Sequence, residues 1–368
     1  MQFLNERRLR ELVYGGAVLG GGGGGSIEAG LSAGREALSH GVPQIVRIEE
    51  LSPKATIVTL SVVGSMSGMT GHHAYVQHAV ALRRLTEIDN RSISALIPSE
   101  VGPQAVTYGW LESVALEIPI VDAPCNGRAH PLGLMGSLGL HRYPRYSTST
   151  VAVGGTHEAH TRVELALRAP VTKASEMVRH AAAKSGVPLA VARNPLPASY
   201  VRKHAALGGL SYAQSIGKIV LNELSLGLSA LLERLQRWTG GRVLAKGRVT
   251  SATLTESHGF TIGRILIREQ NGSECCVTVC NEYLALHRNR ASLAAFPDLI
   301  TLFDFDNAMP LSSPEVKAGK RVAVFGVPRR RLKLGSTMQD RLLLRPLERL
   351  LNVKLIGSGA LAVAVPQC

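Results

Sequence analysis

The chain is 368 residues long, which exceeds the usual size of a single domain and predicts two or three compact units. Hydrophobic residues make up 45% and charged residues 18% of it, a globular balance that argues against intrinsic disorder. A formal net charge of +14 would suit nucleic acid, but aromatic residues are only 4% and no basic stretch is interleaved with them. We therefore expect a small anionic substrate as partner, and no nucleic acid.

Cysteine usage and the distribution of apolar residues predict the compartment. Five cysteines without regular spacing do not form a disulfide framework, which fits a reducing environment. The first residues alternate charges and lack the apolar core of a secretory signal, and the apolar stretch 355–365 is far shorter than the roughly 20 residues of a membrane span. We expect a cytoplasmic protein without a membrane segment. The apolar tail that ends at Cys368 is a candidate for self-association into a homo-oligomer.

A run of six glycines at 20–25 lies between two predicted helices. Asn5 can cap the first helix, to about Val13, and Ser26 can cap the second. Glycine-rich backbone before a helix N-terminus presents free N–H groups and suits a phosphate or carboxylate, so Gly24, Gly25 and Ser26 are candidates for substrate binding. The run follows a helix, whereas a dinucleotide motif follows a strand. We expect neither a nicotinamide nor a flavin cofactor.

The segment up to about residue 168 repeats the order strand, turn, helix. Buried β runs are predicted at 56–63, 92–97 and 118–121, with helices after the first two. This order is typical of an α/β domain with a largely parallel sheet, which we place at 1–168. Ligands in such domains bind at the carboxyl ends of the strands. The residues expected there are His72, His73, Glu100, Asp122 and Cys125.

The pattern changes in the second part of the chain, which we place at 169–368. A helical connection is predicted over 169–240, including one long helix with an apolar stripe from Ile216 to Leu235. Apolar residues then alternate with polar ones, which indicates a small β-barrel or sandwich over about 241–330. A return segment follows at 331–368.

The segment DAPCNGRAHP, residues 122–131, concentrates reactive side chains. Gly127 lets the backbone turn tightly, so that Arg128 and His130 can point into the crevice. Cations beside Cys125 would favour the thiolate, which is the form that attacks carbon or binds a metal. Three roles stay open for Cys125, as nucleophile, as metal ligand or as a small buried residue in a loop where Asp122 caps a helix.

Glu100 and two adjacent histidines complete the candidate site. Glu100 follows a strand and is expected to face the crevice as a general acid or base. His72 and His73 diverge by roughly 100° at a helix start, so at most one of them faces the site. Cys125, one of these histidines and Glu100 are candidate ligands of Zn²⁺ or another divalent metal, although both histidines also fit helix capping or the surface.

Six motifs, taken in order, carry a family resemblance. GGGGGGS, VVGSMSG, IPSEVGPQ, PIVDAPCNGRAHP, FPDLITLFD and EVKAGKRVAVFGVP together resemble the S-methyl-thiohydantoin desulfurase-like family, catalogued beside hydantoin-utilisation genes. Where members often carry D-G-x-G-R-A-x-P, this sequence has Pro124, Cys125 and Asn126 before Gly127. The resemblance implies a three-layer α/β N-terminal domain, a C-terminal part containing a β-barrel, and hydrolytic desulfurisation of a thiohydantoin ring, in catabolism of histidine-derived or related heterocycles.

The implied reaction assigns a role to each candidate residue. A metal-bound hydroxide or the Cys125 thiolate adds to the ring carbon that bears sulfur, and the adduct expels a thiol or sulfide. Glu100, Asp122 or His130 transfers the proton, while Arg128, Asn126 and the helix start at Ser26 hold the substrate. The alternatives are a hydantoinase- or oxoprolinase-like cyclic amide hydrolase, ATP-assisted through the glycine run, and a non-enzymatic basic protein that binds nucleic acid.

Overall fold

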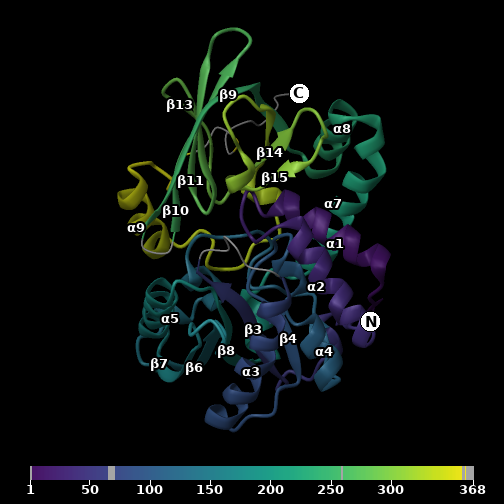
Figure 1. Ribbon diagram of the computed structural model, residues 1–368, viewed down its shortest axis with the longest axis vertical. Helices are drawn as coiled ribbons and strands as arrows, with labels where there is room; N and C mark the ends of the chain where they lie inside the picture. The colour runs from purple at the N-terminus through teal and green to yellow at the C-terminus, as the bar shows by residue number, and fades with distance from the viewer. Residues whose placement is uncertain (1, 65–70, 258–259, 359–360, 362–368) are drawn as a thin grey trace.

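The structure is a computed structural model that describes residues 2–64, 71–257, 260–358 and 361, and the side chains of 71–76 and 257 lie outside this description. Two sheets lie one above the other in Figure 1, with α1 and α7 beside the junction between them. The helices are α1 (Glu6–Leu19), α2 (Ile27–His40), α3 (Gly71–Asp89), α4 (Trp110–Leu116), α5 (Val171–Ser185), α6 (Ala198–His204), α7 (Gly209–Glu223), α8 (Leu228–Thr239) and α9 (Arg341–Leu351).

The first sheet has a parallel centre and antiparallel ends. Its strands are β1 (Gln2–Phe3), β2 (Gln44–Val46), β3 (Thr56–Val63), β4 (Ala95–Pro98), β5 (Ile120–Val121), β6 (Ser147–Gly154), β7 (Val163–Pro170) and β8 (Leu189–Pro197). They are ordered β1-β2-β5-β4-β3-β8-β6-β7, and β2, β5, β4 and β3 run parallel to one another. The parallel sheet expected from the sequence is therefore its central part, and the outer strands pair antiparallel.

Helices cover both faces of this sheet, which makes three layers. Val151 and Val153 of β6 pack with α3, whereas Ala152 between them packs with α5, because successive side chains of a strand point to opposite faces. Strand β8 lies between β3 and β6. The sequence analysis placed a domain boundary between residues 168 and 169. That boundary would assign β8 to the second part of the chain, although β8 belongs to the first sheet.

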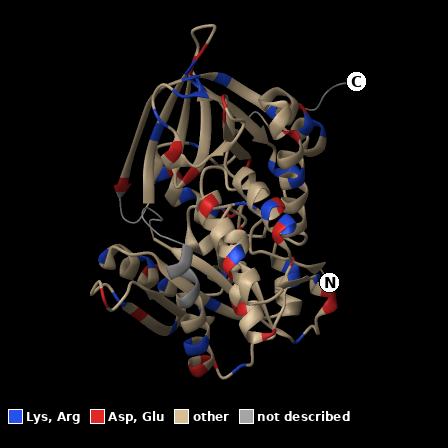
Figure 2. Cartoon of the chain, turned by 45° about the vertical axis from the view of Figure 1, so that its right-hand side comes forward, with Lys and Arg blue, Asp and Glu red and all other residues tan. Residues whose placement is uncertain are grey.

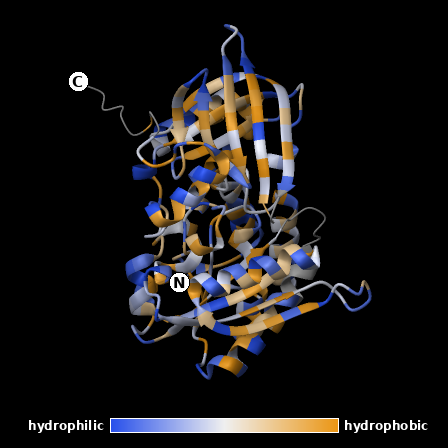
Figure 3. Ribbon diagram, turned by 90° about the vertical axis from the view of Figure 1, so that its left-hand side faces the viewer, coloured by the Kyte–Doolittle hydropathy of each residue, from blue (hydrophilic) through white to orange (hydrophobic). Residues whose placement is uncertain are grey.

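The second sheet is antiparallel and open. Its strands are β9 (Arg242–Ser257), β10 (Phe260–Glu269), β11 (Glu274–Cys280), β12 (Glu282–Arg288), β13 (Ala291–Ala295), β14 (Leu299–Asp304), β15 (Pro310–Leu311) and β16 (Arg321–Val327), ordered β13-β12-β11-β10-β9-β16-β14-β15. The sheet curls until β12 and β13 lie against β14, and Figure 3 shows hydrophobic and hydrophilic residues interspersed along its strands. Among the described residues no ladder joins β13 to β15, so the expected closed barrel is not confirmed.

Both predicted helix caps are present, and one predicted helix is divided. The Asn5 side chain accepts from Arg8 N–H and caps α1, while Ser26 accepts from Ala29 N–H and caps α2. The single long helix predicted through Leu235 is instead two helices, α7 and α8. A 3-10 turn at Leu224–Leu226 lies between them, followed by Gly227 with a φ of +86°, a backbone conformation that favours glycine.

The surface mixes charges of both signs. Figure 2 shows lysines and arginines interspersed with acidic residues over both parts of the chain. In the basic run after β16, Arg330, Arg331 and Lys333 are exposed, whereas Arg329 is half-buried and pairs with Asp298 at 2.9 Å. In the described part of the chain, no helix combines the length and the apolar character needed to cross a membrane. Most of the apolar tail, 362–368, lies outside the described residues.

Candidate functional site

The glycine run lies at the junction between the two sheets. The Gly21 carbonyl accepts from Tyr283 N–H at 2.7 Å, and the Gly24 carbonyl accepts from Gln104 N–H at 3.0 Å. A Cβ at Gly22 would stand 2.7 Å from the Tyr283 ring, and Glu282 occupies the corresponding space at Gly23. The close packing of this loop against both halves of the chain therefore requires glycine.

The substrate-binding residues predicted in this loop have packing roles. Gly24 lies against Gly102 with no room for a side chain, Gly25 lies against Gln104, and the Ser26 hydroxyl caps its own helix. A cleft of about 610 Å³ does open beside them, between α2 and the β14–β15 side of the second sheet. The charged groups that line it are Glu28, Asp304, Glu315 and Lys320, so the N-terminus of α2 faces a mostly acidic wall.

Arg128 is fully buried and joins the two halves of the chain. Its Nη1 donates to the carbonyl of Asp298 at 2.6 Å and to that of Pro297 at 3.3 Å, and its guanidinium stacks over the Phe296 ring at 4.8 Å. Among the described residues its Nη2 has no hydrogen-bond partner, and it lies 3.0 Å from the position that a Cβ at Gly21 would take. The buried charge of Arg128 is balanced electrostatically by Glu282, Asp298 and Glu100.

Glu100 and His130, each predicted from the sequence to face the crevice, are in contact. His130 N–H donates to Glu100 Oε2 at 3.1 Å, and His130 Nε2 lies 3.5 Å from the same oxygen. Burial raises the pKa of Glu100 to about 7, although the hydrogen bond from His130 and the charges of Arg193 and Arg128 favour its ionised form. Burial also lowers the pKa of His130 to about 4, so its imidazole is neutral at pH 7. This carboxyl can therefore accept or release a proton near neutral pH.

Two further charged residues join this pair, and the sequence analysis missed both. Glu282, on β12, is buried beside Gly23, and burial together with the charge of Glu100 raises its pKa well above the usual range. Arg193, on β8, is buried near Glu100. The only available sequence signal was a charged residue inside an otherwise apolar β run. We call Glu100, Arg128, His130, Arg193 and Glu282 the junction cluster.

Cys125 lies near Arg193 and Glu100 of the junction cluster, and its side chain is a protonated thiol at neutral pH. Its Sγ is 3.5 Å from the Thr59 hydroxyl, and burial raises its pKa to about 11. The nearby cation is Arg193, in place of the expected Arg128 and His130, and burial outweighs its effect on the thiol. Neighbouring Asn126 is also fully buried and donates to the Met135 carbonyl at 2.7 Å, which holds the loop in shape.

Asp122 points away from the junction cluster. Its Oδ1 accepts from the backbone N–H groups of Leu210 at 2.7 Å and Ser211 at 3.2 Å, and its Oδ2 accepts from the Ser211 hydroxyl at 2.5 Å. These are the free N–H groups in the first turn of α7, so the carboxylate caps that helix. The sequence analysis considered capping, but of the helix that follows in the chain, and α7 begins 87 residues later.

Family models match nearly the whole chain. The S-Me-THD-like N-terminal domain matches residues 7–161, and the S-Me-THD-like C-terminal domain matches residues 169–333. The chain belongs to the S-Me-THD-like family. This confirms the resemblance that the ordered motifs carried.

A solved structure has the fold of this S-Me-THD-like chain. It is the crystal structure of a protein from Chromobacterium violaceum, with a TM-score of 0.73, 20% sequence identity, and coverage of 96% of this chain and 97% of that chain. At this identity the likeness shows the fold alone. A search of the curated proteins finds no match.

The expected metal ligands of this S-Me-THD-like chain lie only partly within the described structure. His72 and His73 fall in the first turn of α3, and their side chains lie outside the described residues. Within the described residues, no group of three His, Cys, Asp or Glu side chains is placed to hold an ion. The metal site at Cys125 and one histidine therefore stays a prediction.

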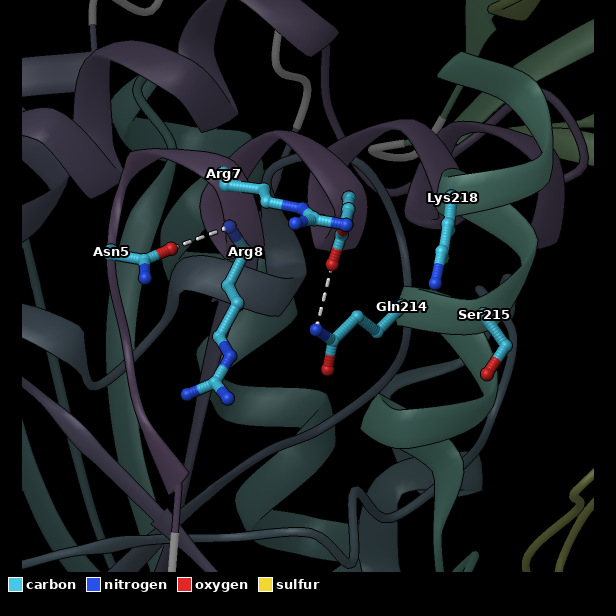
Figure 4. Close-up of a pocket in the computed structure, with 7 residues that line it drawn as sticks. Asn5, Arg7, Arg8, Gln214, Ser215 and Lys218 are labelled. Atoms are coloured by element: carbon cyan, nitrogen blue, oxygen red, sulfur yellow. Dashed lines mark hydrogen bonds and ion pairs between the residues drawn. The ribbon is translucent and has the colours of Figure 1, made fainter. Parts of the chain in front are cut away.

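The outer surface of this S-Me-THD-like chain carries another cleft, of about 360 Å³, between α1 and α7 (Figure 4). Its polar groups are partly engaged, since Glu11 pairs with Arg7 at 2.9 Å and accepts from Gln214 at 2.8 Å. The lining residues are Asn5, Arg7, Arg8, Glu11, Gln214, Ser215 and Lys218. None belongs to the junction cluster, where Glu100 and Glu282 with their raised pKa values lie near Arg128, so we place the candidate site at the cluster.

Proposed function

We propose that this protein hydrolyses the C–S bond of an S-methyl-thiohydantoin or thiohydantoin ring, with the junction cluster as its active site. Membership of the S-Me-THD-like family supports the substrate class. The observation that carries the chemistry is the part-buried Glu100–His130 contact, in which a carboxyl of pKa about 7 lies beside a neutral imidazole. A general base works best when its pKa lies near the operating pH.

Glu100 would move the protons of this reaction. Water adds across the ring C=N bond, with the hydroxyl on the carbon that carries sulfur and a proton delivered through Glu100 to the ring nitrogen. Collapse of the adduct forms the carbonyl and breaks the C–S bond. The hydroxyl proton returns through Glu100 to the departing thiolate, so the products are the hydantoin and methanethiol. In an unmethylated thiohydantoin water adds across the C=S bond instead, and collapse of the adduct with transfer of the hydroxyl proton to sulfur gives the hydantoin and hydrogen sulfide.

Arg128 is suited to stabilise the adduct. Negative charge gathers on the ring oxygen and nitrogen as water adds, and the free Nη2 of Arg128 is a buried donor with a fixed position. Preorganised donors in a dry site stabilise developing charge because they need no reorganisation during the reaction. The carbonyls of Pro297 and Asp298 hold the guanidinium in place.

The direct test is turnover of 2-methylthio-imidazol-4-one. We expect the purified protein to release methanethiol, followed with a thiol reagent, and to form hydantoin in equal amount. Glu100→Gln should lose this activity, whereas Glu233→Gln, at an exposed acid on α8, should keep it. Ring-opened product, or a requirement for ATP, would support a cyclic amide hydrolase instead. A protein that acts on neither ring bond contradicts the proposal.

Metal analysis tests how the water is activated. We propose that Glu100 activates it, and a metal ion held by Cys125 with His72 or His73 would be the alternative source of a nucleophilic hydroxide. The purified protein and Cys125→Ser should be compared by elemental analysis. Stoichiometric zinc that disappears in the variant would make Cys125 a ligand and replace the direct role of Glu100.

A further inference from the structure

Strand β7 has the longest open edge among the described residues. It is the last strand of the first sheet and pairs with β6 on one side only. The other terminal strands, β1, β13 and β15, have two, five and two residues, whereas β7 has eight. Native sheets usually keep an exposed edge short, because its free N–H and C=O groups can pair with another chain. An edge as long as that of β7 is therefore a candidate for strand pairing.

The two faces of β7 differ in chemistry. Exposed and half-buried residues alternate along the whole strand, which Figure 1 shows at the outer margin of the lower half, away from α1 and α7. The exposed face carries charges on the side of α3, where Glu164 accepts from Arg84 at 2.7 Å and Arg168 donates to the Ile88 carbonyl at 2.8 Å. Leu165, on the other face, packs in an apolar cluster with Val178 of α5.

A strand edge can pair antiparallel with the same edge of a second copy around a two-fold axis. Residues directly opposite one another in such a pair both use backbone groups that point outward from the sheet. Outward-pointing groups occur at every second residue of a strand. Opposite residues must therefore be an even number of positions apart, and the axis must pass beside a residue.

An axis beside Ala166 makes the β7 edge complementary to itself. It places Glu164 of one copy opposite Arg168 of the other, and Leu165 opposite Leu167. Each of these pairs occurs twice because of the symmetry. Opposite charges and apolar pairs that face one another across two strands stabilise the pairing. At the axis itself the two small Ala166 side chains face each other without crowding.

The neighbouring registers lack this match. An axis beside Leu165 would set Arg162 opposite Arg168, and like charges in that position destabilise a strand pair. An axis beside Leu167 would set Glu164 opposite Pro170, which has no charge to offer. The charged face and the apolar face therefore select the same register.

Helix α5 adds an exposed apolar side chain beside this edge. Met177 is 50% exposed and lies one turn before Ala181, which packs against the same apolar cluster as Leu165. A second copy paired through Leu165 and Leu167 would bring further apolar surface to this side. The two faces of the joined sheet would then be held differently, one by apolar contacts and the other by ion pairs.

We propose that this protein forms a two-fold homodimer in which the β7 edges of two copies pair antiparallel, with Ala166 at the axis. The pairing joins two eight-stranded sheets into one. Backbone hydrogen bonds supply the affinity, while the side chains on alternate positions fix the partner and the register. Charges on an edge usually keep other strands away, but in this register they attract a second copy. The inference concerns assembly and does not depend on the proposed reaction.

Sedimentation of the full-length protein measures this association. We expect the wild type to be a dimer at micromolar concentration. Glu164→Arg sets two like-charged pairs against Arg168, and Arg168→Glu does the same with negative charges, so each should weaken the dimer by roughly tenfold or more. Glu233→Arg, at an exposed acid on α8, provides the matched control and should leave the dimer unchanged.

Mixing the two charge-reversed variants tests the register. In a mixed pair the arginines of one copy face the glutamates of the other, so the dimer should return with close to wild-type affinity, which an unfolded variant could not give. A monomeric wild type overturns the proposal, and so does a dimer that survives both reversals. Variants that stay apart when mixed contradict the register and with it the proposed interface. None of these results depends on turnover of a thiohydantoin.

Discussion

Glu100 shows how burial adjusts a single residue for proton transfer. Its side chain is 16% exposed, and desolvation raises its pKa to about 7. As a general base it must be ionised, so we expect kcat/KM to be low below pH 7 and to rise through that pH to a plateau. Glu100→Gln should lower the rate by roughly 10²–10⁴-fold and remove the pH dependence of the residual rate. A flat wild-type profile between pH 5 and 9 contradicts this role.

Glu112 of α4 is a buried carboxyl outside the junction cluster. Burial raises its pKa from 4.5 to about 7, so the folded protein binds this proton more tightly than the unfolded chain. Its contribution to stability is therefore complete below pH 4.5 and is lost as pH rises through 7. We expect Glu112→Gln to raise the free energy of unfolding at pH 8 by on the order of 2 kcal/mol relative to the wild type.

Urea unfolding at pH 5 and pH 8 measures this effect. The gain from Glu112→Gln should shrink toward zero at pH 5, where the wild-type carboxyl is already protonated in the folded state. Glu233→Gln, at an exposed position on α8, should show no such pH dependence. If Glu112→Gln had the same effect on stability at both pH values, protonation of Glu112 would not be the cause of that effect.

At the scale of elements, the close crossing of α1 and α7 depends on a glycine in each helix. A Cβ at Gly217 would collide with the Glu11 carbonyl, and a Cβ at Gly15 would collide with the Ala213 carbonyl. The two helix backbones therefore touch, and an added methyl group must push them apart. We expect Gly217→Ala to lower the free energy of unfolding by roughly 1–3 kcal/mol in spite of the better helix propensity of alanine.

Chemical denaturation of Gly217→Ala beside Ser215→Ala tests the helix contact. Ser215 is exposed on the same helix, so its substitution should stay within about 0.5 kcal/mol of the wild type. Stabilisation by Gly217→Ala would mean that propensity outweighs packing and that the helices do not touch here. The sequence analysis placed Gly217 in a helical pattern, but it contained no sign of the partner helix.

Elements were predictable wherever their signals are local. The caps at Asn5 and Ser26 and the strand at 56–63 occur where the sequence places them, because caps and alternation depend on residues a few positions apart. The division between α7 and α8 was missed because the apolar stripe continues across Gly227. A 3-10 turn at Leu224–Leu226 and the positive φ of Gly227 separate the two helices.

At the scale of the whole molecule, Arg128 ties the two sheets together. Its guanidinium, on a loop of the first part, donates to the carbonyls of Pro297 and Asp298 in the second. We expect a single unfolding transition, with amides of β3 and β10 protected to the same free energy in hydrogen exchange. Arg128→Met should lower the unfolding free energy by roughly 3 kcal/mol, because it leaves buried carbonyls unpaired.

Arg237→Met provides the matched comparison, since Arg237 is exposed on α8 and pairs with the exposed Glu233 one turn away. It should change stability by less than about 1 kcal/mol. Two separate transitions in the wild type would show that the halves fold independently. The contacts of Arg128 with Pro297 and Asp298 would then position the candidate site without coupling the folding of the two halves.

The sequence by itself indicated the strand at 56–63, the helix caps at Asn5 and Ser26 and the motifs of the family, and it placed Glu100 and His130 as candidates for one crevice. These rest on spacing along the chain or on the shared rule that strand ends converge at one edge of a sheet. Tertiary structure decided the role of each remaining group. Asp122 caps a helix that begins 87 residues later. The space beside the glycine run is occupied by the side chains of Tyr283 and Glu282.

The same distinction explains Cys125 and Arg193. A thiol near cations in sequence looks reactive, but its pKa depends on how completely the fold removes water from it, and burial raises that pKa to about 11. Arg193 looks like one more residue of a β run until strand register and a bulge place it beside Thr150 and Asn194. Desolvation and pairing depend on contacts between residues far apart in the chain, and for that reason only the folded structure reveals them.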